Sequence, residues 1–304
     1  MRLRIHFVLL ILVTGFCGSV WADVETDSKR KVTVTFMGTL PTLGFGLRND
    51  VKDIDYSTNN SVIPTLGLQY GNFGVSYGRN TGRLDDTIDL STTSQDFQGF
   101  YYYNKFGVDF YYQDYKGYFV DRLPIDSESY FPGMRVTTYT ANYYHKLGGS
   151  NKMSAMTTPI PSKAWFSSLY YILASLSDRS IHSPRNIVLE QDQVDFSSID
   201  EFDNFHVINA TISVGAYFPI HLGGFYVNPG ISIGFGKPLT QFSSDVDVSY
   251  SGKVNLKASA GYAGENFRFG MEVTNDSDAF ELSGPETLQF HSIVVNMIFI
   301  SYTF

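Results

Sequence analysis

The sequence is poor in cysteine and in charge. Its 304 residues include one cysteine, and Asp, Glu, Lys and Arg together make up 17% of the chain, against roughly 25% in a typical soluble domain. A single cysteine excludes a disulfide framework and a zinc site built from several cysteines. The formal net charge is −8, and no basic block offers an electrostatic footprint for nucleic acid. We therefore expect no nucleic-acid partner.

Long hydrophobic runs are also missing. After the first residues of the chain, no stretch offers the about 20 consecutive apolar residues that a membrane-spanning helix needs. The chain beyond those first residues is therefore expected to be either soluble or a membrane-spanning β-barrel, because lipid tolerates only helices and closed barrels as spanning structures.

The N-terminus has the three parts of a secretory signal peptide. Arg2 and Arg4 form a basic start, a short apolar run follows, and Val20 and Ala22 place small residues before a cleavage point. We predict cleavage after Ala22, with an uncleaved anchor as the alternative. The only cysteine, Cys17, lies in this segment, so the mature chain contains none. The domain organisation expected is therefore a signal peptide over residues 1–22 and one domain over residues 23–304.

Aromatic residues and strand-like alternation are abundant. The chain contains 25 Phe and 21 Tyr. Leu66, Leu68 and Tyr70 alternate with small or polar residues, the turn-forming pair Gly71-Asn72 follows, and a second alternating segment begins. The expected strands lie within residues 32–36, 66–70, 73–78, 97–103, 106–116, 134–146, 151–176, 208–218, 225–235, 246–262, 267–274 and 288–304.

The connections between these strands alternate between short and long. The short ones are residues 71–72, 104–105, 147–150, 219–224 and 263–265. The long ones, mostly polar, are residues 42–61, 80–95, 117–131, 177–204, 237–244 and 275–286. This order is typical of bacterial outer-membrane barrels, whose periplasmic turns are short and whose outer loops are long.

The pattern predicts an all-β fold, a transmembrane antiparallel up-and-down β-barrel of about twelve strands. Ten or fourteen strands are the alternatives, because the strand within residues 151–176 is the least regular. A soluble sandwich is disfavoured because many strands are long and aromatic residues crowd their ends. Phe304 ends the chain, as in the last strand that such barrels present to the assembly machinery. We expect the outer membrane of a Gram-negative bacterium, with lipid and the barrel-assembly machinery as partners.

Two segments carry a resemblance to a known family. Residues 98–118 contain the run FGVDFYYQDYKGY, and residues 131–144 contain FPGMRV and NYY. Together they resemble the bacterial outer-membrane family called domain of unknown function 4421, over about residues 32–304. The resemblance implies a barrel in the outer membrane and assigns no activity or site.

Residues suited to catalysis or metal binding are sparse. The mature chain has His145, His182, His206, His221 and His291, none of them spaced as metal ligands. His291 and Ser292 are adjacent, and neighbours on a strand point to opposite faces, so they cannot form a nucleophile–base pair. The acidic segment within residues 177–204 is interpreted as a solvated loop. We expect that the protein is not an enzyme and that it has no catalytic residue, metal site or cofactor. A hydrolase using His206 with a distant Ser or Asp stays as a third hypothesis.

The polar faces of the strands provide the sharper functional hypothesis. Charged residues expected to line the lumen are Asp109, Arg135, Lys253, Lys257, Arg268 and Glu272. Mixed charges across a lumen suit a passive channel for small solutes. They could equally pair with one another and fill the barrel, which would make it a structural or surface-interaction protein. The sequence leaves both readings open.

Overall fold

A computed structural model describes residues 31–58, 62–83, 91–120, 129–156, 165–196, 203–242, 248–282 and 287–304. The predicted signal peptide lies outside the described residues. Residues Val32–Phe304 form one compact unit. Its strands are β1 Val32–Arg48, β2 Asp53–Ser57, β3 Ile63–Tyr70, β4 Phe73–Arg83, β5 Ser91–Tyr102, β6 Phe106–Val120, β7 Tyr130–Gly148, β8 Leu169–His182, β9 Asn204–Tyr217, β10 Ile220–Leu222, β11 Phe225–Phe242, β12 Val248–Ala263, β13 Phe267–Leu282 and β14 Thr287–Thr303. Two short 3-10 helices are η1 Met153–Met156 and η2 Glu190–Asp192.

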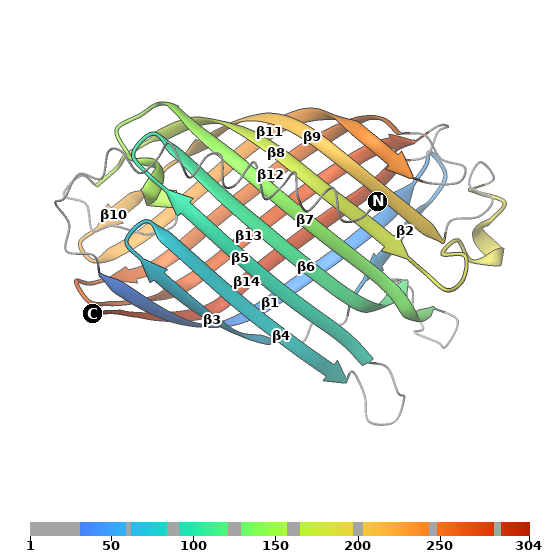
Figure 1. Cartoon of the computed structure of the whole chain (residues 1–304), viewed down its shortest axis with the longest axis horizontal. Helices are drawn as coiled ribbons and strands as arrows, with labels where there is room; N and C mark the ends of the chain where they lie inside the picture. Colours follow the sequence, from blue (N-terminus) through green and yellow to red (C-terminus); the bar gives the residue numbers. More distant parts are fainter. Residues whose placement is uncertain are drawn as a thin grey trace. The chain divides into compact units, whose positions relative to one another are not determined.

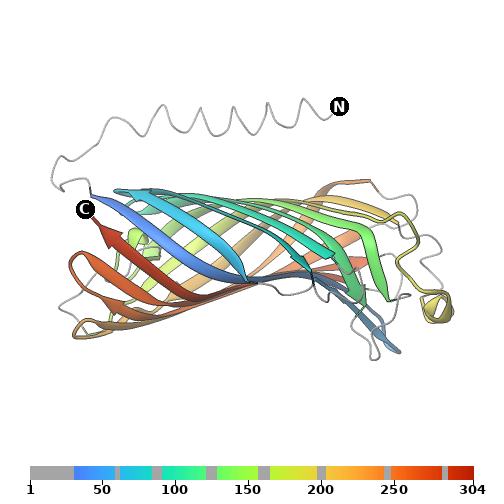
Figure 2. The same ribbon diagram turned by 90° about the horizontal axis from the view of Figure 1, so that it is seen from below.

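The strands form a closed antiparallel barrel. β1 pairs with β14 along its whole length, from Thr33 opposite Thr303 to Arg48 opposite Thr287, and this pairing closes the sheet. Figure 2 shows these first and last strands side by side. Within the described residues the ring has 12 strands, and β2 and β10 are short additions to it. The predicted twelve-stranded barrel is therefore confirmed. Among the same residues no helix is long and apolar enough to cross a membrane.

The strands extend further than the sequence predicted. Residues 42–48, 177–182 and 275–282 were expected in long loops, but they continue β1, β8 and β13. The prediction was wrong there because the alternation changes sense: Leu43, Phe45 and Leu47 are apolar on the inward face instead of the outward one. A search for outward apolar residues therefore ends the strand too early.

The barrel wall changes its composition along its length. β3 pairs with the first part of β1, whereas β2 pairs with the last part. The other edge of β2 pairs directly with β6, with Tyr56 opposite Val120. The outer part of the β4–β5 hairpin is therefore left out of the ring at this level, and Figure 1 shows it projecting beyond the wall. Gly117, at φ 87°, occupies the register shift that lets β6 reach β2, a conformation that favours glycine.

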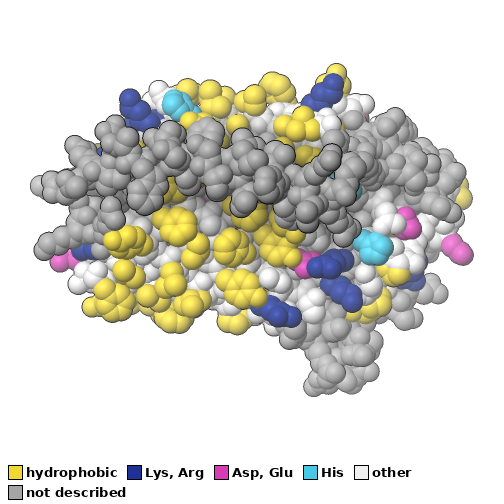
Figure 3. Space-filling model, in the orientation of Figure 1, with side chains coloured by type: hydrophobic (Ala, Val, Ile, Leu, Met, Phe, Trp, Pro, Cys, Tyr) yellow, Lys and Arg dark blue, Asp and Glu magenta, His cyan; other side chains and the backbone are white. Residues whose placement is uncertain are grey.

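The outward face is divided into an apolar and a polar part. We call the end that carries Val32 and Phe304 the terminal end and the opposite one the loop end. On β11, exposed apolar side chains run from Phe225 to Phe235. This span rises about 25 Å at about 3.3 Å per residue and a tilt of about 40°, the height of a lipid-facing band. Figure 3 shows hydrophobic side chains over the half nearer the terminal end and a group of charged and His side chains beyond them.

Candidate functional site: the barrel interior

The interior consists of three layers. A cluster of tyrosine, methionine and leucine side chains fills the terminal end, and a larger apolar cluster fills the loop end. Between them the alternating inward positions carry polar and charged side chains. The layers follow from the sequence, because each strand alternates faces and its inward residue type changes along the strand. β8 shows this order in the inward series Leu173, Ser175, Ser177, Arg179 and Ile181.

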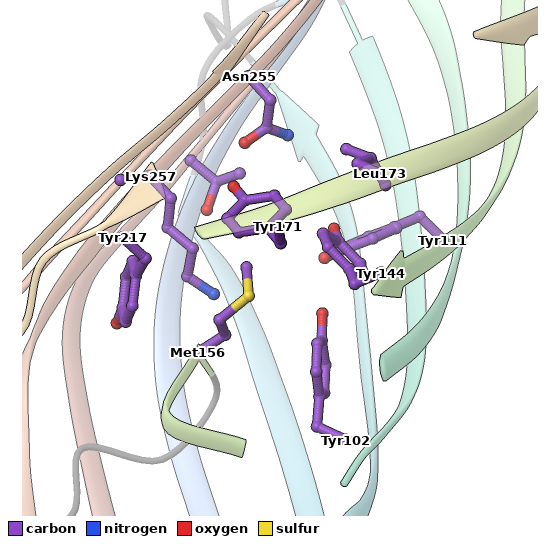
Figure 4. Close-up of a pocket in the computed structure, with 11 residues that line it drawn as sticks. Tyr102, Tyr111, Tyr144, Met156, Tyr171, Leu173, Tyr217, Asn255 and Lys257 are labelled. Carbon is purple, nitrogen blue, oxygen red and sulfur yellow. The ribbon is translucent and has the colours of Figure 1, made fainter. Parts of the chain in front are cut away.

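The terminal-end cluster is closed by helix η1. The rings of Tyr102 and Tyr144 lie 5.6 Å apart, as do those of Tyr144 and Tyr171. Met153 and Met156 of η1 are buried in the same cluster, and Figure 4 shows Met156 among these tyrosines. The cavity left here is about 20 Å³, room for about one water molecule. A larger solute does not fit in this cavity.

The polar layer holds a buried network of ion pairs. Arg179, which is 1% exposed, pairs with the fully buried Asp278. Lys253 Nζ lies 2.7 Å from an oxygen of Asp276 and 3.5 Å from one of Asp278. Such pairing is required because an isolated buried charge costs several kcal/mol. In an ion channel such charges would face passing ions, whereas here they form ion pairs with one another.

Two further carboxylates are held by hydrogen bonds from neutral groups. Asp109 accepts from Tyr102 Oη at 2.6 Å and from Asn142 Nδ2 at 2.7 Å. Asp96 accepts from Tyr115 Oη at 2.6 Å. Asp96 and Asn142 line a cavity of about 100 Å³ in the polar layer. The cavity is large enough for several water molecules and lies between the two apolar clusters.

The loop-end cluster is the main hydrophobic core of the molecule. Phe45 and Tyr56 stack with ring centroids 4.5 Å apart, and the ring centroids of Phe45 and Phe290 are 6.1 Å apart. The guanidinium of Arg179 lies 5.3 Å from the Phe290 ring, where the cluster meets the polar layer. Apolar residues that point inward at this end contact one another, in the way of a soluble protein core.

A segment between β8 and β9 covers the loop-end cluster. We call residues 183–196 the lid. Ile187, Val188 and Phe196 of the lid are at most 1% exposed and belong to the loop-end cluster. Tyr56 Oη donates to the Ile187 carbonyl at 2.5 Å, and the Arg185 guanidinium lies 4.0 Å from the Phe131 ring. The interpretation of this segment as a solvated loop was therefore wrong for the lid.

A polar contact ties the lid to the β1–β2 turn. Lys52 Nζ lies 2.5 Å from Asp192, whose side chain is fully buried, and 3.3 Å from Asp195. Asn49 Nδ2 donates to the Asp195 carbonyl at 2.6 Å. The hydrogen bond with Asp192 raises the pKa of Lys52 above its ordinary value of 10.5. The acidic residues of the lid thus serve as anchors, which the charge pattern alone did not indicate.

Most of the charged residues expected in the lumen do lie on the inward face. Asp109 and Lys253 are buried there. Lys257 Nζ lies 3.8 Å from Glu272 Oε1, and Arg268 donates to the buried Thr303 at 3.4 Å.

Arg135 lies instead on the outward face, paired with Asp114 at 2.6 Å. The aromatic residues on both faces of β6 and β7 hid this alternation in the sequence. Arg179, Asp276 and Asp278 were not predicted, because all three fell within expected loops. Within the described ranges, no group of three or more His, Asp or Glu side chains could hold a metal ion.

Comparison with known proteins places this fold in a family. The sequence matches the domain of unknown function DUF4421 over residues 24–304. The chain belongs to this family. The resemblance seen in the sequence is thereby confirmed, and the DUF4421 chain has an outer-membrane β-barrel fold. No curated protein matches it significantly.

Solved structures similar to this DUF4421 chain are bacterial barrels. The outer membrane protease OmpT from Escherichia coli is 9% identical with a TM-score of 0.39, covering 93% of this chain and 100% of that one. The β domain of the Bordetella autotransporter BrkA is 12% identical with a TM-score of 0.38, covering 91% and 100%. The toluene transporter TodX of P. putida is 7% identical with a TM-score of 0.32, covering 91% of each chain.

Proposed function

We propose that this protein is a closed outer-membrane barrel that acts through its loop-end surface, as a structural or surface-interaction protein. The observation that carries this proposal is the filling of the lumen at both ends. Helix η1 and its tyrosines occupy the terminal end, and the lid and its apolar cluster occupy the loop end. A passive channel for small solutes, the other hypothesis from the sequence, needs a continuous polar path between the two ends.

The energetics of the interior support the closed state. An ion crossing the loop-end cluster would lose its hydration among side chains such as Phe45, Phe131 and Phe290, which are at most 1% exposed. Desolvating a charge in such surroundings costs several kcal/mol or more. Where the polar layer meets this barrier, Arg179 and Asp278 are already paired with each other. They therefore offer little compensation to a passing ion.

The loop-end surface presents exposed apolar groups to a partner. Val51, beside the β1–β2 turn, is 79% exposed, and Val194 of the lid is 85% exposed. The two residues neighbour Lys52 and Asp195, whose ion pair connects their segments. Replacing both valines by Glu is expected to remove attachment of whole cells to a protein-coated surface while the barrel still folds. Unchanged attachment by this double variant would contradict a role for this surface.

Single-channel recording tests the closed lumen. The purified mature chain, inserted in planar bilayers, is expected to give no steady conductance steps. Folding of the same protein preparation is checked by the mobility shift between heated and unheated protein on a gel. Regular ohmic steps from the folded chain would overturn the proposal and restore the channel hypothesis.

A further inference from the structure

A serine, two histidines and an aspartate meet on the outward face of the barrel. On β8 the side chains of Asp178, Ser180 and His182 point outward, since residues 177, 179 and 181 between them are buried. On β9 the side chain of His206 points outward between two buried neighbours. The β8–β9 register places Ser180 directly opposite His206. Side chains in such cross-strand positions have Cβ atoms about 4.5–5.5 Å apart, within reach of a hydrogen bond.

The histidine opposite Ser180 is held by a carboxylate. His206 Nε2 lies 2.7 Å from Asp178 Oδ1, and the two side chains are about one-third exposed, at 29% and 31%. A carboxylate at this distance fixes the ring and stabilises the imidazolium that forms when the histidine accepts a proton. Asp178, His206 and Ser180 therefore have the order of orienting acid, general base and nucleophile. Because Asp178 binds Nε2, the nitrogen left to accept the proton of Ser180 is Nδ1. The contact between nucleophile and base is often long before substrate binds.

The position of this group indicates the class of substrate. On the side nearer the terminal end, the next outward residues are apolar, Leu176 on β8 and Ile208 on β9. From Asp178 and His206 toward the loop end, the outward residues of both strands are polar. The group thus lies at the edge of the lipid-facing band. An acyl chain extending along the band would bring its ester linkage to this level, where lipid head groups begin.

Polar groups also lie on the other side of Ser180. In the β7–β8 register, Thr137 is opposite Ser180, and Arg135 is opposite His182. The Arg135 guanidinium is 54% exposed and pairs with Asp114. Both groups donate to Asp114 in this structure, Arg135 Nε at 2.6 Å and Thr137 Oγ1 at 3.4 Å. Thr137, directly opposite Ser180, would have to turn from Asp114 to donate to the negative oxygen of a tetrahedral intermediate.

We propose that Ser180 and His206 are the nucleophile and general base of an acyl-ester hydrolase site facing the outer leaflet, with Asp178 as a positioning residue. Ser180 Oγ bonds to the ester carbonyl carbon while its proton passes to His206. The alcohol leaves with that proton as the carbon–oxygen ester bond breaks. Water then attacks the acyl-serine, gives a proton to His206, and releases the fatty acid; that proton returns to Ser180 Oγ. The sequence left open a hydrolase using His206 with a distant Ser or Asp, and the strand register identifies these partners as Ser180 and Asp178.

A fluorophosphonate probe with an alkyl chain tests the nucleophile directly. The probe phosphonylates activated serines with loss of fluoride. The mature chain in vesicles is expected to be labelled, and Ser180→Ala is expected to abolish labelling. Ser249→Ala is the matched control, because Ser249 is exposed elsewhere on the wall, on β12. Wild-type labelling no stronger than that of Ser180→Ala would overturn the proposal, whether because neither protein reacts or because both do.

Hydrolysis of 4-nitrophenyl palmitate assigns the other residues. His206→Asn is expected to lower kcat about 100-fold or more, the usual loss when a general base is removed, whereas His182→Asn retains most activity. The opposite result would overturn the assignment of the base. Asp178→Ala is expected to lower kcat with little change in KM, and Asp178→Glu to recover part of the loss. A change confined to KM would contradict a positioning role. The gel mobility shift checks that every variant folds.

Discussion

The lid provides the sharpest test of how the barrel is closed. Phe196 is fully buried in the loop-end cluster. Truncating a buried Phe to Ala costs about 3–5 kcal/mol in a well-packed core. Because the lid is a surface segment that can relax, we take about 3 kcal/mol as the loss. Since every 1.4 kcal/mol is a factor of about ten, Phe196→Ala should raise the open fraction of the lid about 100-fold.

A cysteine reporter measures this opening, because residues 23–304, the predicted mature chain, contain no cysteine. Val188, which is 1% exposed, is changed to Cys and reacted with a maleimide. In the closed lid this thiol reacts slowly, and adding Phe196→Ala should accelerate the reaction about 100-fold. Val194→Ala is the matched control, since Val194 lies in the same lid and is 85% exposed. Equal, fast labelling of all three proteins would refute the reasoning.

Three further predictions concern the ion pairs and the lipid-facing band. Lys52→Ala removes the cation that pairs with the buried carboxylate of Asp192, and because Lys52 is one-third exposed we expect a loss of about 1–2 kcal/mol and about tenfold faster labelling of the same reporter. The raised pKa of Lys52 means that this contact is complete below pH 10.5 and is lost as pH rises through the higher folded value, as lid proteolysis over an alkaline series would show. Arg179→Met should lower the free energy of unfolding in urea by about 3 kcal/mol, whereas Arg135→Met, at an exposed pair, should lower it by at most about 1 kcal/mol. Similar losses for the two variants would contradict the distinction between inward and outward ion pairs. Ile231→Lys, near the middle of the Phe225–Phe235 span, should destabilise the barrel in lipid vesicles by about 2–4 kcal/mol, while Leu239→Lys, further along the same strand, should have little effect.

The lipid-facing part of the barrel could be predicted from the sequence because its chemistry is simple. Leu66, Leu68 and Tyr70 are exposed on β3, and the residues between them face inward, so alternation alone locates the strand. The β3–β4, β5–β6 and β12–β13 turns at the terminal end are short, as predicted, because neighbouring strands of the band follow one another directly. The β7–β8 connection, predicted as the short residues 147–150, instead spans residues 149–168 and carries η1. These two regularities define the number of strands and their antiparallel order.

The loop-end half could not be predicted because its apolar face is reversed. Ile181 is buried inside while His182 points outward, so the alternation has the opposite sense from that in lipid. The Lys52–Asp192 contact joins residues far apart in the sequence, and no local pattern reports how the lid packs. The alignment of Ser180 with His206 depends on the β8–β9 register, which a single sequence does not specify.

Depth-dependent fluorescence quenching tests most directly whether lipid covers only the terminal-end half of the barrel. Trp165 is the only tryptophan of the predicted mature chain, and it is replaced by Phe so that single tryptophans can be placed on β9. In vesicles of brominated lipid, Ile212→Trp should be strongly quenched, and Asn204→Trp, near the loop end, should be quenched weakly. Equal quenching at both positions would show that lipid also covers the polar half of the wall, and would contradict this account.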